Sequence, residues 1–136
     1  MVKELKVVST KLVIDKTGKG EKIINLSGFI EKIQVLYPEE PEIKPSEETE
    51  LIIETNHGEL VLGTRGNTDF VVYPRSKMHG AHGEVLTFDG LNPFPTKFYC
   101  SSFLKITGKF SQAKEVEISS ISIYYWSNED SFDIKV

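Results

Sequence analysis

Apolar and polar residues alternate along most of this 136-residue chain, and the alternation predicts an all-β protein. The clearest strand pair is residues 51–55 with residues 60–64, joined by a turn in which Gly58 can supply a positive φ. No stretch shows a helical period over more than about two turns. The pattern therefore predicts an antiparallel β-sandwich, jelly-roll-like, of about eight to nine strands.

The first predicted strand contains a phase conflict. Leu5 and Val7 take one parity, whereas Leu12 and Ile14 take the other. Side chains alternate with a period of two, so a flat strand cannot place both pairs in one core. A bulge near residues 8–10, or a strand that crosses between sheets, would restore the phase.

The last predicted strand changes phase as well. Val116 and Ile118 share one parity, and Ile121 and Ile123 share the other. One extra residue in the strand would bring both pairs to the same face. We therefore expect a β-bulge at Ser119-Ser120.

Residues 23–37 form a long extended candidate with an interruption at Ser27-Gly28. A helix over residues 29–36 is the competing interpretation, but the β-branched and aromatic residues favour a strand. The mixed composition of the second face predicts that this face is half solvated. The face expected to enter the core carries Phe29, Ile33, Val35 and Tyr37.

Two loops and a tail complete a single predicted domain over residues 1–136. The acidic loop, residues 38–49, contains three prolines and clustered glutamates, so we expect it to be extended and mobile. Residues 76–96 lose the periodicity except for a short strand candidate at 85–88, and a loop of this length is usually functional or an interface. Residues 127–136 predict an edge strand or an arm that pairs with a neighbour.

The net charge of −4 is concentrated in one place. Residues 39–50 hold six glutamates and one lysine, so this stretch carries −5 and the remaining chain +1. Without clustered Lys and Arg, direct binding of nucleic acid or of an anionic membrane is not expected. The first residues lack a signal-peptide pattern and Cys100 is the only cysteine, so we expect synthesis in a reducing cytoplasm and no intrachain disulfide.

Metal binding has two weak candidates. His79 and His82, with His57 and Asp89, offer zinc ligands, but no cysteine or HExxH context accompanies them. The acidic loop offers carboxylates for calcium, but it lacks an Asp-x-Asp-x-Asp-Gly pattern. We expect no metal and no other cofactor.

A catalytic role has one candidate nucleophile. Cys100 would need His79 or His82 as a base. However, Cys100 follows Tyr99 in a β-like run, where a cysteine usually acts as a small buried hydrophobe. Paired carboxylates in a rigid frame are also missing from the pattern. We therefore expect that the protein is not an enzyme.

The aromatic residues suggest a sugar-binding platform, because aromatic faces stack on the apolar faces of sugar rings. The alternative is that one parity of residues 124–126 enters the core while the other lies at a sheet surface or an interface. The residues concerned are Tyr37, Tyr73, Tyr99, Tyr124, Tyr125 and Trp126.

A set of segments, taken in order, is similar to a family of small proteins encoded among the head and tail structural genes of tailed bacteriophages. The resemblance covers roughly residues 22–126. The acidic loop and the residues after Trp126 depart from the family pattern. The segments are Gly28-Phe29-Ile30-Glu31-Lys32-Ile33, Glu50-Leu51-Ile52-Ile53, His57-Gly58, Tyr73-Pro74-Arg75, Phe103-Leu104-Lys105-Ile106 and residues 116–125.

This resemblance implies a non-enzymatic virion component, such as a capsid decoration or head-completion protein. It would be assembled in the host cytoplasm, form homo-oligomers, and bind the major capsid protein or other virion proteins through loops and edge strands. Arg75 would be a charged anchor of the contact loop, or alternatively part of an intradomain salt bridge. A carbohydrate- or receptor-binding sandwich, as in a phage fibre, is the rival function. The residues expected at the interface are Tyr73, Pro74, Arg75, His79, His82 and Phe94.

Overall fold

The computed structural model describes residues 4–77, 79, 81–82, 84–87, 95–110 and 114–127. These residues form eleven strands and no helix, which confirms the all-β prediction. None of the described segments is therefore a helix that could cross a membrane. The strands are β1 (Leu5–Ile14), β2 (Lys19–Asn25), β3 (Gly28–Leu36), β4 (Glu50–Thr55), β5 (Leu60–Arg65), β6 (Phe70–Val72), β7 (Ser76–Lys77), β8 (Pro95–Thr96), β9 (Tyr99–Cys100), β10 (Phe103–Lys109) and β11 (Val116–Ser127).

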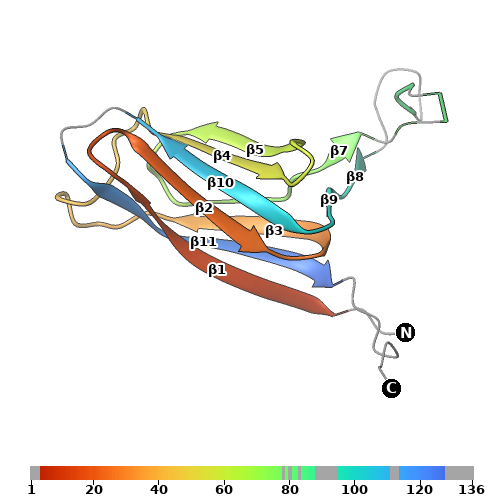
Figure 1. The fold of residues 1–136 in the computed structure, drawn as a ribbon, viewed down its shortest axis with the longest axis horizontal. Helices are drawn as coiled ribbons and strands as arrows, with labels where there is room; N and C mark the ends of the chain where they lie inside the picture. Colours follow the sequence, from red (N-terminus) through yellow and green to blue (C-terminus); the bar gives the residue numbers. More distant parts are fainter. Residues whose placement is uncertain are drawn as a thin grey trace.

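The strands form two antiparallel sheets packed face to face (Figure 1). Sheet A has the order β1-β11-β3-β6, with β9 also paired to β3, and sheet B has the order β2-β10-β4-β5. The first strand pairs with the last, and from β1 to β6 and from β9 to β11 successive strands change sheet except at the β4–β5 hairpin. This is the strand order of a jelly roll. The short strands β7 and β8 pair with each other at one end of the sandwich (Figure 1).

The core lies between the two sheets and consists mostly of isoleucine, leucine and valine. Ile33 of β3 faces Ile123 of β11 across the strand pair, and Ile106 of β10 faces Ile53 of β4. All four side chains are fully buried. Burial of each contributes about 1.5–3 kcal/mol to folding.

The bulge predicted at Ser119-Ser120 is confirmed. The register between β1 and β11 moves from Thr10 opposite Ile121 to Leu12 opposite Ile118, so two serines oppose one lysine. This extra residue places both apolar pairs of β11 in the core. No bulge lies at residues 8–10 of β1 and the strand stays in sheet A, so both solutions predicted for its phase conflict were wrong.

The phase conflict in β1 has another solution: Leu5 and Val7 do not enter the core. They are 48% and 53% exposed, whereas Leu12 and Ile14 are buried. The side chains of β1 alternate without a break between the inner and outer faces of sheet A. Its outer face therefore presents apolar side chains on the outside of the sandwich.

A second bulge, which the sequence pattern did not reveal, lies in β3. Tyr124 pairs with Lys32 and Tyr125 pairs with Ile30, so Glu31 is the extra residue. Both Ile30 and Ile33 are consequently buried, and the charged pair between them is turned to the outer face. The prediction that Phe29 enters the core is therefore wrong: its side chain is only half-buried and lies against Tyr99, with ring centroids 5.0 Å apart.

The loops agree with the sequence pattern in part. The β4–β5 turn has Gly58 at φ 82°, and the interruption predicted at Ser27-Gly28 falls one residue earlier, at Leu26-Ser27 between β2 and β3. The acidic loop is not extended, because it folds into turns whose backbone bonds include Lys44 N to Glu40 O. It also accepts a hydrogen bond from the backbone N–H of Glu117 at the start of β11.

The long predicted loop is closed at its base by β7 and β8, which Figure 1 shows projecting beyond the two sheets. Of the strand candidate at residues 85–88, Val85 forms an isolated bridge with His79. Phe94 and Asp89, together with the predicted arm beyond Ser127, lie outside the described residues.

Candidate functional site

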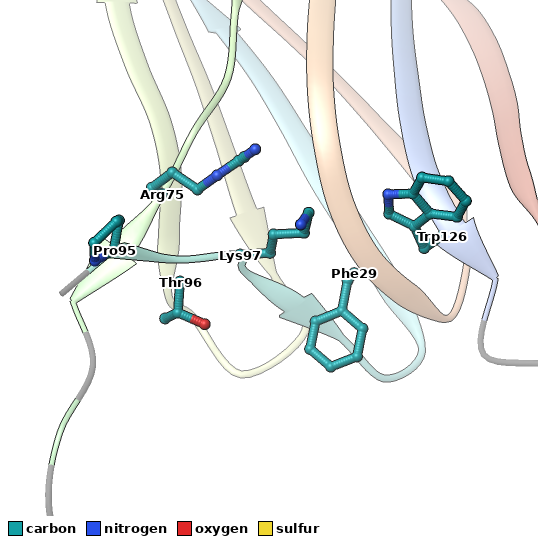
Figure 2. A pocket seen from close by; sticks show the side chains of 6 residues that line it. All are labelled: Phe29, Arg75, Pro95, Thr96, Lys97 and Trp126. Atoms are coloured by element: carbon teal, nitrogen blue, oxygen red, sulfur yellow. The ribbon is translucent and has the colours of Figure 1, made fainter. Parts of the chain in front are cut away.

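A cleft of about 550 Å³ lies at the end of the sandwich where β3 begins and β11 ends. Figure 2 shows Arg75, Lys97 and Trp126 directed toward a common space, with the ring of Phe29 below it. These side chains come from β3, from β11 and from the two segments that lead into and out of the 76–96 loop. The lining residues are Phe29, Arg75, Pro95, Thr96, Lys97 and Trp126.

The carboxylate of Glu31 organises this cleft. The bulge in β3 turns Glu31 to the outer face, where the Nε1–H of Trp126 donates to Oε1 at 2.9 Å. Arg75 Nη2 donates to Oε2 at 3.2 Å, and Lys97 Nζ lies 3.6 Å from Oε1. Two cations thus surround one carboxylate, and the cluster carries a net charge of +1.

These partners lower the pKa of Glu31 from its ordinary value of 4.5. The hydrogen bond from Trp126 is the largest cause, partial desolvation opposes it, and the charges of Lys97 and Arg75 add to it. Glu31 is consequently ionised at neutral pH and acts as a fixed acceptor.

Arg75 joins the segment after β6 to β3. Its Nη1 donates to the backbone oxygen of Glu31 at 3.0 Å and to that of Pro74 at 2.7 Å. Together with the contact to the carboxylate, these bonds form the intradomain salt bridge considered for Arg75. The role of Arg75 in an interface stays a prediction.

Around the cleft, the outer face of sheet A carries a group of apolar and aromatic side chains, here called the aromatic face. Tyr124 and Trp126 stand on the outer side, opposite Val7 and Leu5 in the register, while Tyr125 packs against the core. This confirms the prediction that one parity of residues 124–126 enters the core while the other lies at the surface of the sheet. The aromatic face consists of Leu5, Val7, Phe29, Tyr99, Tyr124 and Trp126.

The other predicted interface residues are spread along the segment leading from the cleft. Tyr73 is 57% exposed, Pro74 is buried, and His79 and His82 are exposed beyond β7. Phe94 belongs to the part of the chain that is not described. Of the five predicted residues that the structure describes, only Arg75 lines the cleft.

The predicted metal ligands do not converge in the described ranges. Within residues 4–77, 79, 81–82, 84–87, 95–110 and 114–127, no three His, Cys, Asp or Glu side chains gather to hold a metal. His57 instead lies in the β4–β5 turn, 3.3 Å from the hydroxyl of Ser101.

Cys100 is fully buried, and burial raises the pKa of its thiol. The thiol donates to the backbone oxygen of Phe103 at 3.0 Å. Because the thiolate is the reactive form, we expect iodoacetamide to alkylate the native protein far more slowly than the urea-unfolded protein. Mass spectrometry of timed samples measures both rates, and rapid native alkylation at neutral pH would contradict this assignment.

Sequence reasoning missed Glu31, Lys97 and the pairing of Trp126 with Glu31. One signal was present: Ile30 and Ile33 flank two charged residues, a spacing that a flat strand cannot bury on one face. Lys97 gave no comparable signal, because an isolated lysine near a loop is ordinary.

Comparison of the chain with known proteins finds no matching family model, no similar curated protein and no similar solved structure.

Proposed function

We propose that this protein is a non-enzymatic structural component of a tailed-phage virion, either a capsid decoration or a head-completion protein. It binds the major capsid protein or another virion protein through the aromatic face and the adjoining base of the 76–96 loop. The sequence resemblance over residues 22–126 supports virion proteins as the binding partners. The jelly roll supports it more generally, since this architecture recurs in viral capsid proteins.

The aromatic face is the observation that carries this proposal. Leu5, Val7 and Tyr99 are each more than a third exposed and lie on the same side of sheet A. Exposed apolar side chains grouped on one face of a sheet are a feature of interaction sites in soluble proteins. Ion pairs lie on both outer faces: Lys105 with Glu21 and Arg65 with Glu50 on sheet B, and Arg75 and Lys97 with Glu31 on sheet A.

The edge of sheet A adds a second means of contact. β1 is ten residues long and pairs with β11 on one side, while the described residues place no strand on its other side. Gly20 of β2 lies against the backbone of Val13 at one end of β1, and the remaining edge can accept a strand from another chain. The same edge would serve the expected homo-oligomer.

A matched pair of substitutions tests the proposal. Val7→Lys should weaken binding to particles that lack this protein by about tenfold or more, because it places a charge in the apolar contact. Ile23→Lys is the control, since Ile23 is 47% exposed on the edge strand β2 of the other sheet. Co-sedimentation with the particles measures both. Equal binding of the two variants would remove the aromatic face from the interface.

A further inference from the structure

We propose that the cleft binds one ring of an acidic sugar, that is, a saccharide unit bearing a carboxylate. The proposal goes beyond the structural role and does not depend on it. A cleft of about 550 Å³ falls within the size range of small-molecule sites and is large enough for one sugar ring.

The aromatic walls fit a sugar ring. Phe29 and Trp126 both line the cleft, and they come from neighbouring strands at paired positions of the register. Aromatic faces contact the apolar C–H faces of sugars well. The indole N–H is already bonded to Glu31, so the orientation of the Trp126 ring is fixed before a ligand arrives.

The charges fit a single carboxylate. Arg75 has five N–H donors, of which its bonds to Glu31 and Pro74 use three. Lys97 is 38% exposed, and its ion pair with Glu31 is long at 3.6 Å, so most of its hydrogen-bonding capacity remains. The cluster therefore presents surplus donors and one uncompensated positive charge.

A carboxylate would complete this charge balance, whereas a neutral sugar would leave the positive charge unmatched. A phosphate dianion would overcompensate it. Thr96 adds a hydroxyl at the same wall for a sugar hydroxyl. The ligand that matches both the rings and the charge is an acidic monosaccharide unit.

Fluorescence offers a direct test, because Trp126 is the only tryptophan of the chain. Glucuronate should change the emission saturably with a Kd of about 1 mM, the affinity expected for a ligand of this size. Glucose, which lacks the carboxylate, and acetate, which lacks the ring, should each bind at least tenfold more weakly.

Two lysine variants make the test specific. Lys97→Met should weaken glucuronate binding by about tenfold, whereas Lys105→Met, which removes an ion-paired lysine from sheet B, should leave it unchanged. Circular dichroism would verify that both variants are folded. The proposal is overturned if glucose or acetate binds as well as glucuronate, if both variants bind alike, or if no saturable change occurs.

Discussion

Replacing Gly28 with alanine is expected to destabilise the protein by about 3–5 kcal/mol, a large part of the stability of a small domain. Gly28 begins β3 with a φ of 151°, a conformation that residues with a β-carbon rarely adopt. An added β-carbon would also collide with the carbonyl oxygen of Trp126. Since that obstacle is backbone, relief requires that β3 and β11 separate at the cleft. Urea unfolding followed by circular dichroism measures the loss.

Gly63→Ala is the matched control. Gly63 lies in β5, where an added β-carbon would have the Leu60 side chain as its nearest neighbour, at 3.7 Å. We expect a change within about 0.5–1 kcal/mol, and in the stabilising direction, because glycine weakens a strand interior. Equal effects of the two substitutions would mean that the close approach of β3 and β11 at Gly28 is unimportant.

Replacing Glu31 with alanine should cost about 1–3 kcal/mol, because it leaves the Trp126 N–H without its acceptor and takes the carboxylate away from Arg75, which keeps its bonds to backbone oxygens. Glu31→Gln should cost less, since the amide oxygen can still accept from Trp126. The comparison is Glu50→Ala, which breaks a 2.8 Å ion pair whose Arg65 partner is 62% exposed. That pair should contribute only about 0–1 kcal/mol.

The contribution of Glu31 should depend on pH in a defined direction. Its pKa is lower in the folded protein than the ordinary 4.5, so its stabilisation is fully present above the unfolded value. It is lost as the pH falls through the folded value. The stability difference between the wild type and Glu31→Gln should therefore shrink between about pH 7 and about pH 3. A difference that grows on acidification would contradict the assigned network.

Local signals in the sequence predicted much of the sandwich. The β4–β5 hairpin follows from the short apolar runs on both sides of Gly58, whose positive φ the turn requires. The bulge at Ser119-Ser120 follows because Ile118 and Ile121 enter one core only if an extra residue separates them. In both cases, only one arrangement of the strand lets its apolar side chains be buried together.

Other features depended on tertiary structure and could not be predicted. Leu5 and Val7 resemble core residues in the sequence, because an apolar side chain on an outer face has the same pattern as a buried one. Phe29 was placed in the core because its parity matches that of Ile33, and only the bulge at Glu31 breaks this match. The cleft combines residues from four separate segments, so no local pattern could reveal it.

Quantitative mass spectrometry of purified phage particles from the source tests the central claim most directly. The proposed structural role predicts that this protein is present in the particles, at a copy number comparable to that of the major capsid protein if it decorates the capsid. A few to a dozen copies would indicate a head-completion or connector position. Absence of the protein from the particles would contradict the account.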